Sequence, residues 1–354
     1  MKKILLALVL CGGARGARAE GVEILFGPGG ADRHALASAP TVSTVPTGEF
    51  VVASPVVDLR RDPAPVAEGA GARRPYAVDP LQETQVLYGE TVYSFEEKDG
   101  WVRVEAPEQP EYTHGDRWRG YPGWVPRSSL EPRPSQYEPN GVVTARYGLV
   151  RPNRRWFSKG LALPMGSRLY LAYKKGRWYR VAGVRGESGW MRTKEARTTV
   201  DTPRRAADIR GVLLRSAEKF LGEPYYWGGR AGHRAEENAP SGVDCSGLVN
   251  VAYRVAGLEI PRDAHEQFMA SRAIARSSEL EPGDLVFLAK TSKPDRMVHV
   301  MIFAGGEQMI EAVHEENVVR RVTFKKKLGE AKSTLRPGQT AGGYVVTFGR
   351  LIPR

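Results

Sequence analysis

The stretch "DCSGLVNVAYRVAG", residues 244–257, predicts a helix that begins with a nucleophile. Asp244 is of a residue type that caps helix N-termini, apolar side chains recur on one face, and Gly257 is a common helix stop. Cys245 would then lie in the first turn, where unpaired backbone N–H groups and the helix dipole favour a thiolate. Because Asp244 adds a negative charge that opposes the thiolate, we expect a histidine partner.

Further helices and strands are predicted on both sides of this stretch. Residues 206–222, "AADIRGVLLRSAEKFLG", have helical apolar periodicity and end at a glycine. Residues 281–290, "EPGDLVFLAK", and 297–319, "MVHVMIFAGGEQMIEAVHEENVV", are typical of strands. The Gly305-Gly306 pair between two apolar runs predicts a two-residue hairpin turn.

The hairpin register predicts which histidines can meet. If Ala304 faces Glu307, His299 pairs with Ala312, and His314 lies diagonal to His299 at roughly 7 Å between Cβ atoms. Cys245, His299 and His314 would then supply a nucleophile, a base and a group that orients the base. The other histidines, at positions 34, 114, 233 and 265, lie in polar stretches and are expected at the surface.

The N-terminus has the layout of a secretory signal peptide. Lys2 and Lys3 precede the apolar run 4–10, and a small-residue site predicts cleavage before Glu20. An alternative interpretation makes Cys11 a lipid anchor, although Leu10 stands where such signals need a small residue. In an exported chain a single remaining thiol is either a buried hydrophobe or a reactive group. No segment is long enough to span a membrane. The signal peptide predicts export to the periplasm, the cell envelope or the outside of the cell.

The composition is that of a globular, basic protein. The chain has 354 residues, 41% of them hydrophobic, and a formal charge of +12. A basic exported protein favours anionic envelope polymers over nucleic acid. We expect the charge to be scattered, because no cluster of Lys and Arg with interleaved aromatics is identified. No phosphate-binding loop and no zinc-ligand spacing are recognised, so neither cofactor nor metal is expected.

A degenerate tryptophan repeat precedes the helices. "DGWVRV" is followed by "YPGWVP" (121–126), and "KGRWYRV" by "ESGWMR" (187–192), each within short alternating strands. These motifs resemble bacterial SH3-type (SH3b) domains. The resemblance implies two small β-barrels, at 49–132 and 138–198, after an N-terminal segment at 20–48.

Five ordered motifs then carry a second resemblance. They are "YYWGG" (225–229), "DCSGLV" (244–249), "IPRDAHEQ" (260–267), "PGDLVFL" (282–288) and "HVMIF" (299–303). In this order and spacing they are similar to those of the NlpC/P60 papain-like cysteine peptidases. The resemblance implies an α+β catalytic domain at 205–354, preceded by the two SH3-like β-barrels. It assigns Cys245 as nucleophile, His299 as base and His314 as the orienting residue.

The domain order further resembles that of γ-D-glutamyl-L-diamino acid endopeptidases, which cut cell-wall stem peptides that have a free N-terminal L-alanine. The positions that this implies for substrate binding are Tyr225, Asp244, Ser246, Tyr121 and, as a further candidate, Glu83. Asp244 would pair with the substrate ammonium. Ala264 departs from the serine of relatives, so Arg262 or Ser246 would have to bind the D-glutamyl carboxylate. The insertion 230–240 has no counterpart.

Three alternatives to this function remain open. The chain could act on intact peptidoglycan, it could be an amidase on another acyl substrate, or it could be a non-catalytic wall-binding protein. If the chain hydrolyses or binds the cell wall, its partners are cell-wall components; if it is an amidase, its substrate is another acyl compound. We expect a monomer that binds no nucleic acid.

Overall fold

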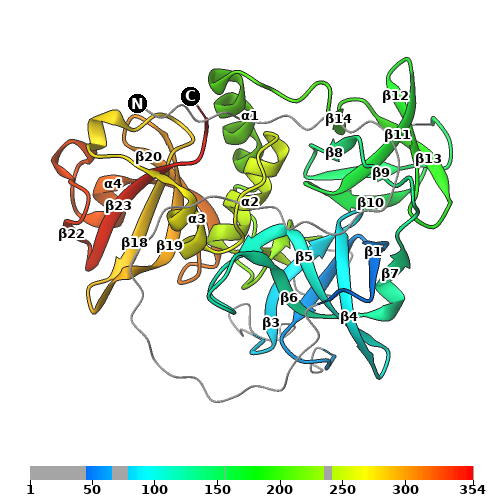
Figure 1. Ribbon diagram of the computed structural model, residues 1–354. Helices are drawn as coiled ribbons and strands as arrows, with labels where there is room; N and C mark the ends of the chain where they lie inside the picture. Colours follow the sequence, from blue (N-terminus) through cyan, green and yellow to red (C-terminus); the bar gives the residue numbers. More distant parts are fainter. Residues whose placement is uncertain (1–44, 66–78, 156, 235–240, 354) are drawn as a thin grey trace, which may run out of the picture. The chain divides into compact units, whose positions relative to one another are not determined.

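The computed structural model describes residues 45–65, 79–155, 157–234 and 241–353 (Figure 1). The predicted signal peptide and most of the segment 20–48 lie outside these residues. Two antiparallel β regions come first along the chain, and an α+β region follows them. Within the described ranges, no helix has the length and apolar character needed to cross a membrane.

The first β region forms a seven-stranded antiparallel sheet in the order β3-β2-β6-β5-β4-β1-β7. Its elements are β1 (Gly48–Val52), β2 (Val56–Arg60), β3 (Gln82–Leu87), β4 (Thr91–Lys98), β5 (Trp101–Glu111), β6 (Arg119–Pro126), the 3-10 turn η1 (Arg127–Ser129) and β7 (Leu130–Pro132). Alternate residues of β5 and β6 are buried, which matches the alternation in the sequence.

The second β region contains a five-stranded sheet, ordered β13-β12-β11-β8-β14, and a β9–β10 pair. Its elements are β8 (Gly141–Val143), β9 (Tyr147–Val150), β10 (Leu161–Pro164), β11 (Arg168–Lys175), β12 (Trp178–Ala182), β13 (Ser188–Arg192) and β14 (Ala196–Thr198). Tyr179, Val181 and Met191 point into the core of this region, whereas their strand neighbours Trp178 and Trp190 are only partly buried.

The α+β region has an antiparallel sheet, whose strands run β17-β23-β18-β19-β20-β21 with β22 paired to β23; helices α1, α2 and α3 pack on one face of it and α4 on the other. The helices and turns are α1 (Ala206–Glu218), α2 (Cys245–Val255), α3 (Ala264–Ala270), η2 (Ser277–Glu279), α4 (Phe324–Leu328) and η3 (Lys332–Thr334). The strands are β15 (Arg230–Ala231), β16 (Gly242–Val243), β17 (Arg272–Ala273), β18 (Leu285–Lys290), β19 (Lys293–Gly305), β20 (Gln308–Val313), β21 (Val318–Thr323), β22 (Thr340–Ala341) and β23 (Tyr344–Arg350).

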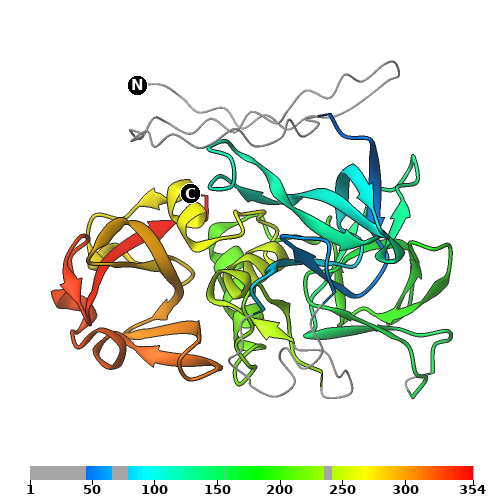
Figure 2. The same cartoon turned by 90° about the horizontal axis from the view of Figure 1, so that it is seen from below.

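The two predicted long helices are confirmed, with two differences. Helix α1 ends at Glu218, and the chain reaches Gly222, at a φ of +84°, through a further turn. In α2 all eleven residues are buried, rather than one face only. The reason is visible in Figures 1 and 2: α2 lies between the β19–β20 part of the sheet and the first β region. Its polar residues are accommodated by partners, since the Asn250 amide donates to the Ile260 carbonyl at 2.9 Å.

Buried arginines of the α+β region bind the first β region. The carboxylate of Glu90, in the turn before β4, is fully buried and accepts from Arg230 at 2.8 Å and also from Arg254. The pKa of Glu90 is held below its ordinary value, because the two guanidinium groups outweigh the effect of burial. Since an unpaired buried charge costs several kcal/mol, this cluster couples the stability of the two regions.

Candidate active site

Cys245 is the first residue of α2, within the first turn as predicted, and it is a free cysteine whose exposed fraction is 9%. Asp244 caps the helix, since its Oδ1 accepts a hydrogen bond from the Gly247 N–H at 2.6 Å. A Cβ at Gly247 would lie 2.1 Å from the carbonyl oxygen of Gly229, so no larger residue fits there. The glycine after "DCS" therefore allows the loop at 229 to pack against the start of the helix.

His299 and Glu311 form the second part of the site. The Nε2 of His299 lies 2.8 Å from the Oε2 of Glu311, on the neighbouring strand β20. Burial alone would lower the pKa of His299, but hydrogen bonds with the Cys245 thiol and the Glu311 carboxylate outweigh it and raise the pKa to about 9. Despite its own burial, Glu311 has a pKa lowered to about 2 by His299 and Lys327. At neutral pH the imidazole is therefore protonated beside the thiol, an arrangement that favours the nucleophilic thiolate.

The predicted hairpin register was wrong by one residue. Phe303 pairs with Met309 and Gly305 with Gln308, with an irregularity between the two pairs, so the turn residues are Gly306 and Glu307. In this register His299 lies across from Val313 rather than from Ala312. A shift of one residue exchanges the faces of a strand, and it brings Glu311 to the side of His299.

The structure consequently places Glu311, and not His314, against His299. His314 is exposed and follows the end of β20, where its ring makes an edge contact with Tyr225 at 5.2 Å between centroids. The sequence interpretation overlooked Glu311, although a carboxylate in the middle of the apolar strand "QMIEAV" is an unusual residue that calls for a partner. Its other oxygen accepts from the Arg320 guanidinium at 2.9 Å.

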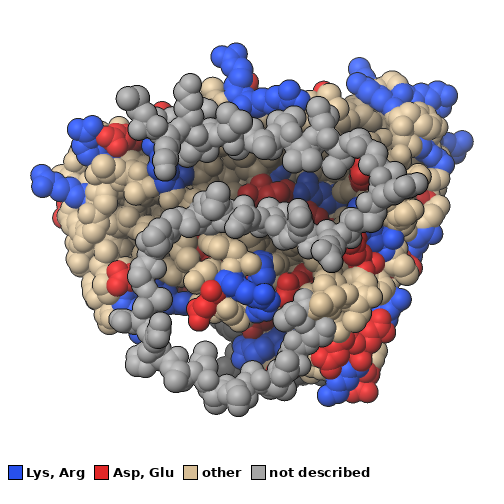
Figure 3. Space-filling view, in the orientation of Figure 1, with Lys and Arg blue, Asp and Glu red and all other residues tan. Residues whose placement is uncertain are grey.

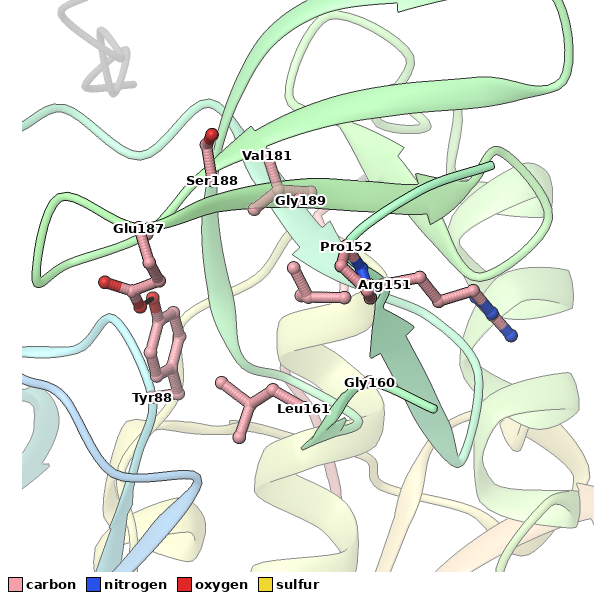
Figure 4. A pocket seen from close by; sticks show the side chains of 11 residues that line it. Tyr88, Arg151, Pro152, Gly160, Leu161, Val181, Glu187, Ser188 and Gly189 are labelled. Carbon is pink, nitrogen blue, oxygen red and sulfur yellow. Dashed lines mark hydrogen bonds between the residues drawn. The ribbon is translucent and has the colours of Figure 1, made fainter. Parts of the chain in front are cut away.

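Cys245, His299, His314 and Tyr225 line one cleft of about 320 Å³. Its remaining walls are formed by Trp227, Leu288, Lys290, Val298, Glu315, Lys327 and Tyr344. Another cavity, of about 220 Å³, lies in the second β region beside Tyr88, Arg151 and Glu187 (Figure 4). That cavity contains no cysteine or histidine, so the cleft at Cys245 is the candidate active site.

Asp244, Arg262 and Ser246 bind one another in the structure. Both oxygens of Asp244 accept from the buried Arg262 guanidinium, at 3.1 and 2.8 Å, and one also accepts from the Gly228 N–H. Arg262 further donates to the Ser246 hydroxyl at 2.8 Å and has no exposed surface. Because these groups satisfy one another, the structure does not support Asp244 as an ammonium receptor. For the same reason it does not support Arg262 or Ser246 as the receptor of the D-glutamyl carboxylate.

Tyr121 instead contacts the residue after Arg262. Its hydroxyl donates to Asp263 Oδ2 at 3.1 Å, which connects β6 of the first β region to the start of α3. Burial raises the pKa of Asp263 to about 6, and the nearby Arg262 only partly opposes this effect. The carboxyl side chain is 38% exposed, so a ligand can reach it. Asp263, which the sequence interpretation did not select, is therefore an accessible acid near the nucleophile helix.

Glu83 is already paired with two cations. Arg61 Nε donates to Glu83 Oε1 at 2.8 Å, and His114 Nε2 lies 3.7 Å from Glu83 Oε2. Hydrogen bonds to Glu111 and Glu83 raise the pKa of His114 to about 10, so this histidine belongs to a charge cluster rather than to a free surface. The Tyr121 ring packs on His114 at 5.1 Å between centroids.

The described part of the 230–240 insertion is held by strand pairing and by the second β region. Arg230 and Ala231 pair with Val243 and Gly242, and Tyr147 of the second β region donates to the Gly232 carbonyl. Within the described ranges, no group of three or more His, Cys, Asp or Glu residues is arranged to hold a metal ion.

Comparison with known proteins gives consistent matches. The NlpC/P60 family model matches residues 222–334. A gamma-D-glutamyl-L-lysine dipeptidyl-peptidase of Bacillus cereus is 32% identical over 67% of this chain and 69% of that protein. The protein of the same name in Bacillus subtilis is 30% identical over 71% and 79%. The crystal structure of an NlpC/P60 family protein from Bacillus cereus superposes with a TM-score of 0.69 at 24% identity, over 86% of this chain and 100% of that chain.

Proposed function

The chain belongs to the NlpC/P60 family of cysteine peptidases, and we propose that it hydrolyses the γ-D-glutamyl–diamino acid bond of cell-wall stem peptides. This proposal rests on the hydrogen-bonded series Cys245, His299 and Glu311. Cys245 begins the buried helix α2, and Cys245 and His299 line the cleft. The two relatives that match over about 70% of the chain are named for the same γ-D-glutamyl bond.

The proposed reaction begins when the Cys245 thiolate attacks the carbonyl carbon of the amide. Its proton is held by His299, which the Glu311 carboxylate orients through the 2.8 Å hydrogen bond. The backbone N–H of Cys245, at the start of α2, is a natural donor to the developing oxyanion. His299 then protonates the departing amine, and a water molecule hydrolyses the acyl-enzyme with His299 as the base.

We assign the N-terminal end of the substrate to Tyr121 and Asp263. A free L-alanine ammonium would pair with the accessible Asp263 carboxylate, which accepts the Tyr121 hydrogen bond. Since the pKa of Asp263 is about 6, the carboxylate is ionised at neutral pH. Glu83 is the other candidate acid, but Arg61 and His114 both pair with it, whereas the Arg262 guanidinium, 3.7 Å from Asp263, is shared with Asp244.

Three further parts of the proposal rest on the sequence. The two N-terminal β regions are bacterial SH3-type barrels, consistent with their short antiparallel strands and paired Gly-Trp motifs. The protein is exported through the N-terminal signal peptide and works in the periplasm or outside the cell. The free-ammonium requirement makes it an enzyme that trims released peptides rather than intact wall.

Hydrolysis of L-Ala-γ-D-Glu-diaminopimelate with a free and an N-acetylated alanine tests this function. We expect Cys245→Ala to abolish cleavage, and acetylation to lower kcat/KM by about 150-fold, the equivalent of about 3 kcal/mol for a carboxylate left without its cation. Asp263→Asn should remove most of that discrimination, and KM for the free peptide should rise as the pH falls below about 6.

Equal rates on the two peptides in the wild type would mean that the enzyme acts on intact wall. Full activity of Cys245→Ala would exclude the cysteine mechanism. Tight binding to wall material without any turnover would favour the wall-binding alternative.

A further inference from the structure

The net charge of the chain is concentrated in the second β region. Residues 141–198 contain 14 Lys and Arg but only 2 Asp and Glu, a net charge of +12. The whole chain has 52 basic and 40 acidic residues, so the remainder is balanced, with 38 of each. The expectation of a scattered charge was therefore wrong, and the basic character belongs to one region of the protein.

Most of these cations have no carboxylate partner within the described residues. Four arginines of the region pair with carboxylates, and Arg197 donates to the Val255 carbonyl. Nine others form no ion pair within the described residues: Arg154, Arg155, Lys159, Lys174, Lys175, Arg177, Arg180, Arg192 and Lys194. Of the two acids, Glu195 is paired with Arg151, which leaves Glu187 as the acid that faces solvent.

Six side chains form a grid of cations and aromatics on the outer face of β11, β12 and β13. Directly paired residues of adjacent strands share a face, so the register defines two rows. One row is Tyr173, Arg180 and Trp190, and the other is Lys175, Trp178 and Arg192. The opposite face of these strands carries Leu171, Tyr179, Val181 and Met191, which are buried in the core.

The grid is held together by stacking. Arg192 lies over the Trp178 ring at 5.4 Å, and Arg180 lies over the Trp190 ring at 5.2 Å. Arg154, from the segment between β9 and β10, covers Trp190 at 5.2 Å, and the Tyr173 ring, which is 55% exposed, meets Trp190 edge-on at 5.8 Å. Figure 3 shows Lys and Arg side chains gathered at the upper right, where Figure 1 places β11–β13. Stacking fixes the guanidinium planes while their outer N–H groups remain available.

We propose that this face docks the protein on an anionic phospholipid surface. Basic side chains gain about fivefold each in binding next to such a surface, and Trp and Tyr prefer the headgroup level because they have an apolar ring and a polar tip. Phe157, which is 66% exposed near Arg154 and Arg155 in the sequence, adds apolar surface at the rim. The grid residues lie side by side on the exposed face of three adjacent strands, so that several cations and aromatic rings can contact one lipid surface together.

Vesicle co-sedimentation of the full-length protein tests this proposal. We expect binding to vesicles of phosphatidylcholine with 30% phosphatidylglycerol, weakening as salt is raised, and little binding to phosphatidylcholine alone. The triple variant Lys175→Gln, Arg180→Gln, Arg192→Gln, which removes the three cations of the grid, should bind about 100-fold more weakly, by the fivefold increment for each charge. A matched variant, Lys325→Gln, Lys326→Gln, Arg336→Gln, removes the same charge from exposed positions of the α+β region and should bind as the wild type does.

Thermal unfolding of both triple variants checks that they fold, independently of peptidase activity. The proposal is overturned if the wild type does not bind the anionic vesicles, or if the control variant loses as much binding as the first. Binding to soluble polyphosphate or DNA without binding to vesicles would also overturn it, because the face would then be a polymer site.

Discussion

Replacing Glu311 with glutamine should move the alkaline limit of activity to lower pH. The carboxylate lies 2.8 Å from His299 Nε2 and stabilises the protonated imidazole. Together with the Cys245 thiol it raises the pKa of His299 from 6.5 to about 9, which corresponds to roughly 3 kcal/mol at 1.36 kcal/mol per unit. Since Glu311 is one of two contributors, its loss should lower the pKa of His299 by about 1 to 2 units.

The sign of the effect follows from the proton that His299 must carry. His299 donates this proton to the leaving amine, so activity is lost as the pH rises through the His299 pKa. In the wild type we expect kcat/KM to fall above pH 9, and in Glu311→Gln above about pH 7.5. At neutral pH the variant should be about 10- to 100-fold slower, because the imidazole loses the carboxylate that orients it for proton transfer.

The assay is kcat/KM for the free tripeptide, measured from pH 5 to 11 in the wild type and in three variants. Glu316→Gln is the matched control, since it removes a nearby carboxylate that pairs with Arg320 and not with His299. His314→Ala should change KM but leave the alkaline limit in place, because His314 contacts Tyr225. An unchanged limit in Glu311→Gln, or an equal shift in His314→Ala, would refute the assigned roles.

Two further variants test the packing that holds the site. Glu90→Gln should lower the free energy of unfolding by about 3–5 kcal/mol in one cooperative transition, because it leaves Arg230 and Arg254 buried without their carboxylate. The control Glu131→Gln, whose partner Arg185 is half exposed, should lower it by less than about 1 kcal/mol. A small loss in Glu90→Gln, or separate unfolding transitions for the two regions, would contradict the coupling. Gly247→Ala should lower the free energy of unfolding by about 1–3 kcal/mol and kcat/KM at least about tenfold, because its Cβ would lie 2.1 Å from the Gly229 carbonyl oxygen. The control Gly211→Ala meets only the end of the flexible Arg215 side chain, so its stability should be unchanged or slightly higher. Wild-type activity in Gly247→Ala would show that the loop at Gly229 can move to accommodate the methyl group.

The local sequence determined the helices, the strands and the position of the nucleophile. Asp244 caps α2 and Cys245 begins it, because capping and apolar periodicity act over only a few residues. Strands β18 to β21 follow from their apolar runs and turn residues in the same way. Five motifs were enough to identify the family, because each is a short stretch of sequence whose residues and order can be recognised without the fold.

Only the tertiary structure decided which charged groups meet. An irregularity near Gly305 shifts the β19–β20 register by one residue, which is enough to put Glu311 rather than His314 beside His299. Arg262 is 18 residues from Asp244, yet it takes both of its carboxylate oxygens and leaves Asp263 as the accessible acid. The grid on β11–β13 likewise depends on cross-strand pairing. Side-chain periodicity tells which face a residue occupies, but the partner across a strand or between regions depends on register and packing, which no short stretch of sequence contains.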